Sequence, residues 1–203
     1  GSSFKPFIYS AALEAGFTPA SIVLDAPVVY ETPASEDGTE EEEDWRPVND
    51  TRRFYGPTRL RDALARSRNL VTIRLMRQMG VAYTHDYVQR FGLPGDHIPA
   101  DLTAALGTAQ LTPLEMATGF AVFANGGSRV SSYLVERVYA ADGSILKQAE
   151  PRQACADCAV HNPEGGGAAV TIADDQLAPR VISEANAWII TDLMREVIRS
   201  GTG

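Results

Sequence analysis

Apolar side chains recur at helical spacing near the start of the chain. In residues 4–15 they repeat every three or four positions, which predicts a helix that Gly16 ends. Pro6 fits such a helix only in the first turn, where backbone N–H groups have no intrahelical acceptor. The helix should therefore begin near Ser2 or Ser3, which places Ser2 at its N-terminus.

The same spacing predicts five further helices, at about 60–66, 69–79, 83–91, 112–124 and 183–199. We expect Gly56-Pro57 to form a turn, with Thr58 as the N-cap of the first of these helices. Thr112 and Ser183 are the expected N-caps of the last two, and Thr112-Pro-Leu-Glu has the pattern of a capping box.

Strand patterns are short. Residues 22–30 are β-prone but interrupted by Pro27, which predicts an edge strand or an extended segment. Residues 130–147 alternate around Asp142-Gly143, a turn dipeptide typical of a β-hairpin. Residues 148–178 are rich in loop-forming residues and are expected to be a loop-rich insertion.

The composition is that of an ordinary globular domain. The chain has 203 residues, of which 44% are hydrophobic and 22% charged, enough for one domain with a sizeable core. Its apolar runs are too short to cross a bilayer. The first residues, Gly-Ser-Ser, do not have the basic and apolar parts of a signal peptide, so we expect the chain to begin inside a longer protein.

The formal net charge of −8 argues against a nucleic-acid partner, because such proteins need a basic surface. Much of the charge lies in an expected acidic loop at 31–44, where residues 36–44 include seven acidic residues. A block of like charge usually forms a solvated loop. Cation binding is the alternative, although the run lacks the ligand spacing of a calcium loop.

The two cysteines, Cys155 and Cys158, lie close together in a loop-like context. Two thiols cannot complete a four-ligand zinc site, and the surrounding pattern is not that of a redox motif at a helix start. A local structural disulfide is the favoured interpretation, and a pair of inert reduced cysteines is the alternative.

Candidate chemistry begins with Ser2 and Lys5. Serine and lysine three residues apart on a helix share one face, so the amine can approach the hydroxyl. A lysine among apolar groups has a lowered pKa and can accept the serine proton, and the helix N-terminus favours developing negative charge. The pattern S-x-x-K alone is weak, because it occurs by chance and because Gly-Ser-Ser is common in expression tags.

A second candidate is Ser67-Arg68-Asn69, at the junction of two predicted helices. Ser67 could relay a proton between Lys5 and a leaving amine, and Asn69 could bind a substrate amide and Lys5. The structural alternative is that Ser67 and Asn69 only cap the adjoining helices.

Taken in order, several motifs resemble those of one known family. They are GSSFKPFIYSAALEAGFTPAS, W-R-P-x-N, LRDALARSRNLVTIRLM and LTPLEMATGFAVFANGG, and together they resemble the transpeptidase domain of a class A penicillin-binding protein of the 1A type. The resemblance covers nearly all of residues 1–203. It implies an α+β fold, an incomplete β-lactamase/DD-transpeptidase-like fold that is mostly the helical part, with flanking sheet strands missing.

The resemblance also implies roles for the candidate residues. Ser2 resembles the family nucleophile and Lys5 its general base, while Ser67 and Asn69 match the ends of the second motif. Substrate would contact Ser2, whose backbone N–H resembles an oxyanion donor, and Asn69. No metal or other cofactor is implied, and the three histidines are scattered along the chain.

The sequence departs from the family at the third motif, K-T/S-G. Its only lysines are Lys5 and Lys147, and neither precedes Thr-Gly or Ser-Gly. Thr202 in the C-terminal SGTG lacks the preceding lysine, so we do not assign it to that motif. The 203 residues are therefore expected to be part of a domain and a poor enzyme in isolation.

The implied function is peptidoglycan cross-linking by serine-type D-Ala-D-Ala transpeptidase or carboxypeptidase chemistry, with stem peptides and β-lactams as ligands. The implied location is the periplasmic face of the bacterial inner membrane, through an upstream anchor, with glycosyltransferase activity on another domain. A β-lactamase would need a deacylating E-x-x-L-N motif, which is absent. The alternative from another class is a non-catalytic sensor or scaffold.

Overall fold

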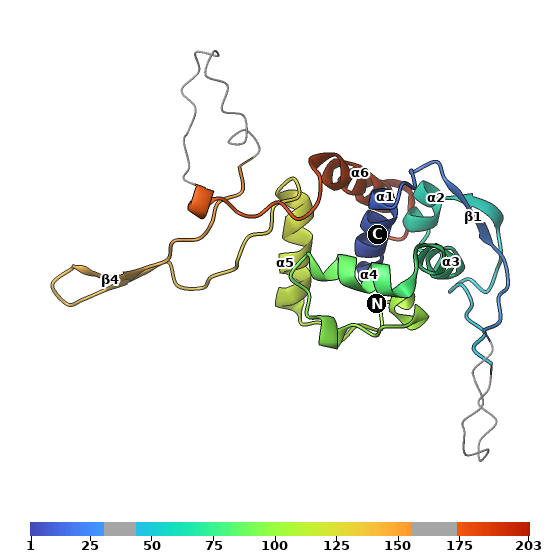
Figure 1. Cartoon of the computed structure of the whole chain (residues 1–203), viewed down its shortest axis with the longest axis horizontal. Helices are drawn as coiled ribbons and strands as arrows, with labels where there is room; N and C mark the ends of the chain where they lie inside the picture. Colours follow the sequence, from blue (N-terminus) through green and yellow to red (C-terminus); the bar gives the residue numbers. More distant parts are fainter. Residues whose placement is uncertain (31–43, 156–173) are drawn as a thin grey trace, which may run out of the picture. The chain divides into compact units, whose positions relative to one another are not determined.

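The computed structural model describes residues 1–30, 44–155 and 174–203. These residues form an α+β arrangement of helices and two small two-stranded sheets (Figure 1). Contacts divide the chain into two compact units. Unit 1 is Gly1–Val88, Gly95–Gln110 and Asp192–Gly203, and unit 2 is Gln89–Pro94 and Leu111–Thr191.

Unit 1 is mainly helical. Its elements are a 3-10 turn η1 (Ser2–Phe4), α1 (Lys5–Glu14), β1 (Ile22–Asp25), β2 (Gly56–Arg59), α2 (Leu60–Ala65), α3 (Asn69–Met79), α4 (Val81–Gln89), and the 3-10 turns η2 (Gly95–His97) and η3 (Leu102–Leu106). The C-terminal part of α6 (Glu184–Ser200) also belongs to this unit.

Helix α1 is the core of unit 1. It packs against α2, α3 and η3, and all its residues from Lys5 to Ala12 are buried. Figure 1 shows α2, α3 and α4 around it. Tyr83 of α4 donates to the Ala11 carbonyl (3.3 Å), and the hydroxyls of Tyr87 and Ser10 lie 3.1 Å apart. Burial on every side makes α1 a rigid support for the residues at its N-terminus.

The predicted start of this first helix is confirmed. The 3-10 turn η1 covers Ser2–Phe4 and continues directly into α1, so Pro6 lies within the first turn of the α-helix. The predicted end is also confirmed, because α1 stops at Glu14 and Gly16 has a φ of +92°. Two further helices also end where the sequence predicts. These are α3, which ends at Gly80, and α5 (Pro113–Ala124), which ends at Asn125.

The predicted turn at Gly56-Pro57, with Thr58 as an N-cap, is wrong. These residues form β2, which pairs antiparallel with β1 in the register Val23↔Thr58 and Leu24↔Pro57. The N-cap of α2 is Arg59, without a side-chain cap. The open edge of β1 offers backbone hydrogen bonds that no local pattern in Gly-Pro-Thr-Arg reveals, and Pro57 is tolerated because β2 is itself an edge strand.

Unit 2 is built on α5 (Pro113–Ala124), whose capping box at Thr112 and Glu115 is present as predicted. Phe123 of α5 packs on Phe91 and Phe120, with ring centroids 5.0 and 6.0 Å away. The predicted hairpin is also present, as β3 (Arg137–Tyr139) and β4 (Ile145–Gln148). The N-cap Ser183 accepts from the Asn186 N–H (3.1 Å) at the start of α6.

The turn after α5 depends on a glycine at position 127. Gly127 has a φ of +100°, and a Cβ there would lie 2.3 Å from the Ile182 carbonyl oxygen. Gly126 also has a positive φ, of +62°, but open space around it. A side chain at position 126 would therefore meet only the strain of a positive φ, whereas one at position 127 would also clash with Ile182.

We expect Gly127→Ala to lower the free energy of unfolding by about 1–3 kcal/mol more than Gly126→Ala does, because only the former forces a backbone shift. Urea denaturation of the two variants measures the difference. Equal destabilisation would show that strain alone, and not the close approach of Ile182, requires glycine.

Two sequence predictions fall partly outside the described residues. Cys155 is disulfide-bonded, but Cys158 lies outside the described residues, so the pairing of the two stays a prediction. Of the acidic loop predicted at 31–44, only Asp44 is described, and it pairs with Arg46 (3.0 Å). Among the helices that the structure describes, none has both the length and the apolar character needed to span a membrane.

Candidate active site

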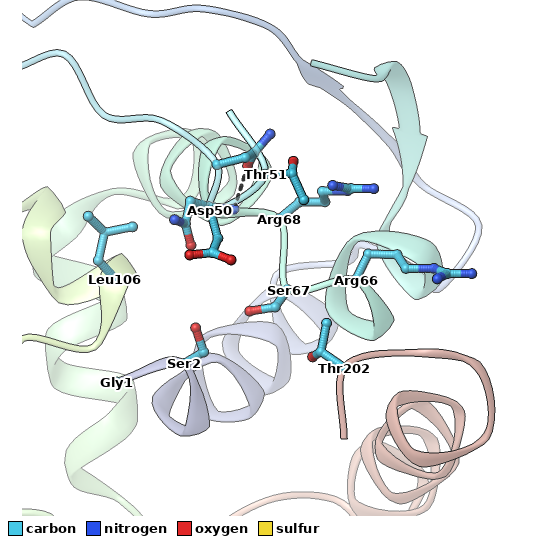
Figure 2. Close-up of a pocket in the computed structure, with 11 residues that line it drawn as sticks. Gly1, Ser2, Asp50, Thr51, Arg66, Ser67, Arg68, Leu106 and Thr202 are labelled. Carbon is cyan, nitrogen blue, oxygen red and sulfur yellow. Dashed lines mark hydrogen bonds between the residues drawn. The ribbon is translucent and has the colours of Figure 1, made fainter. Parts of the chain in front are cut away.

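A pocket of about 430 Å³ opens in unit 1 at the N-terminus of η1 (Figure 2). It is lined by residues from five separate parts of the sequence: Gly1, Ser2, Asn49, Asp50, Thr51, Arg66, Ser67, Arg68, Asn69, Leu106 and Thr202. Three of the four predicted site residues, Ser2, Ser67 and Asn69, are among them. The fourth, Lys5, lies beneath them in the core.

Ser2 is the exposed residue of the predicted pair. Figure 2 shows its hydroxyl pointing into the pocket, on the side where Ser67 also presents its hydroxyl. The 3-10 turn that carries Ser2 is closed by the Phe4 N–H, which donates to the Gly1 carbonyl (3.0 Å). Phe4 is buried against Phe7, with ring centroids 5.7 Å apart. This anchor holds the exposed hydroxyl on a fixed backbone.

Lys5 has the environment of a lysine adapted for proton transfer. Only 1% of it is exposed, and its ammonium group donates to three oxygens: Ser67 O (2.7 Å), Ser67 Oγ (2.9 Å) and Asn69 Oδ1 (2.7 Å). Burial removes water from the charged form and lowers the pKa of Lys5 to about 8. All three N–H donors of the protonated lysine therefore have acceptors. Because its pKa is lowered, a fraction of Lys5 is uncharged near neutral pH and can accept a proton.

Ser67 lies between α2 and α3 in an uncommon backbone conformation. Its φ of +52° falls in the left-handed region, which serine rarely occupies. The Ser67 N–H donates to Leu64 O (3.0 Å) and the Arg68 N–H to Ala63 O (2.8 Å), which closes α2. This tight turn directs both the carbonyl and the hydroxyl of Ser67 at Lys5. Strain of this kind is often retained at functional sites.

The alternative role for Ser67 and Asn69, capping of adjoining helices, is not what their side chains do. The N-cap of α3 is Arg68, and no side-chain cap of its own is present there. The side chains of Ser67 and Asn69 instead accept from Lys5. Asn69 also donates through Nδ2 to Val48 O (3.0 Å), which ties it to the segment before α2.

The sequence did not indicate two polar residues that support this cluster. Asn49 accepts through Oδ1 from the Asn69 N–H (2.9 Å), and its Nδ2 donates to Asp25 Oδ1 (2.7 Å). Both residues are buried, with Asn49 2% and Asp25 0% exposed. Asn49 belongs to the W-R-P-x-N motif, but that motif gave no role for it. Asp25 lies within the β-prone segment 22–30 and ends β1, and nothing local marks it as buried.

Thr202 lines the pocket even though it does not belong to a K-T/S-G motif. The Thr202 N–H donates to Ala65 O (3.1 Å), which holds the C-terminal turn against the end of α2. Gly201 is required for this approach, because a Cβ there would lie 2.1 Å from Ala65 O. These backbone contacts place Thr202 at the wall of the pocket.

The arrangement combines an accessible hydroxyl, a buried amine of lowered pKa and a second hydroxyl bonded to that amine. Such a set can activate a serine for attack on a carbonyl carbon and carry the proton to a leaving group. Within the described residues no cluster of histidine, cysteine and carboxylate side chains could hold a metal ion. The chemistry that these residues support is nucleophilic acyl transfer.

Comparison with known proteins agrees with this chemistry. The family model for the penicillin-binding protein transpeptidase domain matches residues 1–203. Penicillin-binding protein 1A of Pseudomonas aeruginosa is 42% identical over 230 residues, covering 100% of this chain and 27% of that protein. The protein of the same name from Neisseria cinerea is 40% identical, with 100% and 22% covered.

Solved structures show the same relationship. Penicillin-binding protein 1A from Haemophilus influenzae superposes with a TM-score of 0.84 at 36% identity, covering 100% of this chain and 30% of that one. An imipenem acyl-enzyme of penicillin-binding protein A from M. tuberculosis gives a TM-score of 0.70 at 24% identity, covering 98% and 43%, which is a likeness of fold alone. The chain thus spans about a quarter of the length of the curated relatives.

Proposed function

Because the chain belongs to the penicillin-binding protein transpeptidase family, we propose that it carries the serine acyl-transfer centre of a peptidoglycan DD-transpeptidase. The proposed substrates are stem peptides ending in D-Ala-D-Ala, and β-lactams are the proposed covalent inhibitors. On this proposal residues 1–203 are part of one transpeptidase domain, with the loop at 31–44 and the insertion at 148–178 as additions to it.

One observation carries the proposal more than any other. Lys5 is buried, has a lowered pKa and donates to both Ser67 and Asn69. A buried lysine without a carboxylate partner is costly and is retained where its neutral form is needed. The Lys5 amine donates to the Ser67 hydroxyl (2.9 Å), and Ser2 lies three positions before Lys5 along the chain.

In the proposed acylation step, neutral Lys5 takes the Ser2 hydroxyl proton while Ser2 Oγ bonds to the carbonyl carbon of the penultimate D-Ala. The negative charge on the carbonyl oxygen is stabilised in part by the Ser2 backbone N–H. The C–N bond to the terminal D-Ala then breaks, and the departing amine receives a proton from Lys5 through Ser67. The products are an ester on Ser2, free D-Ala and neutral Lys5.

In the second step, the amine of another stem peptide attacks this ester. Its proton passes to Lys5, a new amide bond forms, and Ser2 Oγ leaves and recovers its proton. If water attacks in place of the amine, the same steps give the carboxypeptidase product. Asn69 is the proposed partner for an amide of the bound peptide.

Labelling with fluorescent penicillin, followed by intact mass and peptide mapping, tests the proposal. One adduct on Ser2 is expected in the protein that carries this chain, and weaker labelling is expected of the 203 residues alone because they contain no K-T/S-G motif. An adduct on another residue would contradict the assignment. Absence of any adduct from the intact protein would favour a sensor or scaffold, and rapid nitrocefin turnover would indicate a β-lactamase.

The acylation rate should depend on pH through Lys5. Its pKa of about 8 means that the amine is largely protonated at pH 6.5 and largely neutral at pH 9.5. Because only the neutral amine accepts the Ser2 proton, we expect the second-order rate constant for penicillin acylation to rise through pH 8 and then level off. A rate that is flat or falls between pH 7 and 9 would show that Lys5 is not the base.

The proposal extends to the location and to an additional activity of the intact protein. Similarity to penicillin-binding proteins 1A supports a place on the periplasmic face of the inner membrane, with a membrane anchor and a glycosyltransferase domain outside these residues. Fractionation of the intact protein, together with a lipid II polymerisation assay, tests both parts. Recovery of the intact protein from the cytosol would contradict the proposed location.

A further inference from the structure

Helix α3 receives its cap from a distant residue. Its N-cap, Arg68, makes no capping hydrogen bond with its side chain, but another residue provides an acceptor for the first turn. Asn49 Oδ1 accepts from the Asn69 N–H (2.9 Å) and lies 3.4 Å from the Leu70 N–H. A side chain twenty residues earlier in the sequence thus satisfies the free N–H groups that every helix start exposes.

The orientation of the Asn49 amide is determined by its other end. Its Nδ2 donates to Asp25 Oδ1 (2.7 Å) and to Arg53 O (2.8 Å), so both of its N–H groups are used. The amide oxygen must then face α3. Reversal of the amide would place N–H groups against N–H groups at α3 and an oxygen against the Asp25 carboxylate, so it is strongly disfavoured.

Asp25 is a fully buried carboxylate at the end of β1. Its Oδ2 has no hydrogen-bond partner among the described residues, but it lies 3.9 Å from Arg68 Nε. The Arg68 guanidinium in turn stacks on the Tyr55 ring, 3.4 Å from the centroid. Asp25 therefore contacts the Ser67–Asn69 turn twice, through Asn49 and through Arg68.

These contacts end at Lys5. Asn69 is held by its backbone N–H, which donates to Asn49, and by its side-chain Nδ2, which donates to Val48 O. With both groups bound, the Asn69 Oδ1 can only face Lys5, which donates to it at 2.7 Å. Within this support, Arg68 and Asn69 belong to the Ser67–Asn69 motif, whereas Asp25 and Asn49 lie outside both motifs.

We propose that Asp25 and Asn49 are positioning residues of the acyl-transfer reaction, which hold the Ser67–Asn69 turn against Lys5 and keep water away from its amine. The inference rests on the proposed function, since it assigns these residues a part in that reaction. They act through Asn69 and Arg68 and need not touch the substrate.

The consequence for Lys5 follows from the geometry. If Asn49 no longer holds α3, Asn69 and Ser67 can move away from Lys5 and water can reach the amine, which weakens the desolvation that lowers its pKa. The charged groups near this cluster include Asp25 and Arg68 at the turn, and Asp50 and Arg66 on the pocket wall. Arg74, which donates to Leu24 O and Ala26 O on either side of Asp25, and Arg53, whose carbonyl accepts from Asn49, also lie close to it. Asn49→Ala changes none of these charges, so a change in Lys5 titration reports on hydration and geometry.

Residues 1–203 contain two lysines, Lys5 and the exposed Lys147. In the intact protein labelled with 13C at lysine Cε, the NMR signal that is lost in Lys5→Met is assigned to Lys5, and the signal lost in Lys147→Arg is assigned to Lys147. We expect Asn49→Ala to raise the pKa of Lys5 by about one unit toward its ordinary value of 10.5. In the intact protein, penicillin acylation at pH 8 should fall about 10- to 100-fold.

The matched control is Thr84→Ala. Thr84 is also buried in unit 1 and loses one hydrogen bond, to Gly80 O (2.9 Å), but it lies in α4 away from the pocket. It should lower the stability of the protein while the Lys5 titration and the acylation rate stay within about twofold of the unmodified protein. If Asn49→Ala behaves in the same way, the residue is structural only and the proposal is wrong.

Asp25 provides a second test. Asp25→Asn keeps an acceptor for Asn49 Nδ2 and should leave acylation within about threefold, whereas Asp25→Ala removes the acceptor and should resemble Asn49→Ala. The double variant should be only slightly worse than Asn49→Ala alone, because the two residues share the 2.7 Å Asn49–Asp25 hydrogen bond and the second contact of Asp25, to Arg68, is the longer one at 3.9 Å. Fully additive losses would contradict this. Should Asn49→Ala not fold, Asn49→Ser, whose hydroxyl is too short to bridge, replaces it with the same expected shifts.

The positioning role of Asn49 and the proposed acyl-transfer function can be rejected separately. The NMR titration needs no substrate, so it tests the link between Asn49 and Lys5 even if Ser2 is never acylated. If Ser2 of the unmodified protein is labelled but the Lys5 titration is unchanged in Asn49→Ala, the proposed function stands and the positioning role is rejected. Loss of Ser2 labelling in the unmodified intact protein would reject the proposed function, whatever the titration shows.

Discussion

Replacement of Ser2 by alanine is expected to abolish penicillin labelling and cross-linking, with acylation at least about 1,000-fold slower than in the unmodified protein. The hydroxyl that points into the pocket is the atom to which the acyl group would bond. We do not expect Ser67 to replace it, because Ser67 Oγ already accepts from Lys5 and lies in a different turn. Time courses with fluorescent penicillin, read by intact mass, give the rate.

Ser3→Ala is the matched control for this prediction. Ser3 follows Ser2 in the same 3-10 turn, is also exposed, and does not line the pocket. Its replacement should leave both the labelling rate and the stability within about twofold. If Ser2→Ala is still labelled at an unchanged rate, or if Ser3→Ala is the inactive variant, then the nucleophile has been assigned to the wrong serine.

Replacement of Lys5 by methionine should slow acylation by about 100- to 10,000-fold, the range expected for loss of a general base. Methionine has a similar length and an apolar side chain, so it fits a site that is 99% enclosed. It also leaves Ser67 Oγ, Ser67 O and Asn69 Oδ1 without their shared donor, which costs about 1–3 kcal/mol of stability per unsatisfied group. Removal of a buried charge offsets part of this cost.

Lys147→Met serves as the control, since Lys147 is the other lysine and is exposed on β4. It should change neither the acylation rate nor its pH dependence. The remaining activity of Lys5→Met should no longer rise through pH 8, because the titrating group is gone. A persistent rise with the same midpoint would assign the pH dependence to another residue and remove Lys5 from its role as base.

Local chemistry was sufficient to predict the helices and several of their ends, although α4 begins two residues earlier than predicted and the N-cap of α2 is Arg59 in place of Thr58. Pro6 cannot lie deeper than the first turn of a helix, so the start at Ser2 followed from backbone sterics alone. The capping box at Thr112 and the hairpin turn at Asp142-Gly143 depend on contacts between residues two or three positions apart. Such interactions form in the same way whatever surrounds them, which is why these elements could be identified in advance.

Four site residues could also be named from the sequence, because Ser2 with Lys5 and Ser67 with Asn69 each have the spacing of a short motif. That the two motifs meet could not be derived from spacing. It depends on the packing of α1 against α3, which brings Lys5 within 2.7 Å of Asn69. Resemblance to a known family supplied the expectation of that contact, and the tertiary structure supplied its geometry.

A helix that starts beside Ser2 and a lysine one turn later were determined by the sequence, since each follows from neighbours along the chain. The proposal that Ser2 is the nucleophile rests on this placement together with the family resemblance. The tertiary structure alone decided that Gly56–Arg59 becomes a strand, that Ser67 adopts a left-handed conformation and that Asn49 caps α3. Each of these depends on a partner twenty or more residues away, or on burial of a lysine whose charge needs acceptors. A hydrogen bond between distant residues leaves no periodic trace in a sequence, so only the folded chain reveals it.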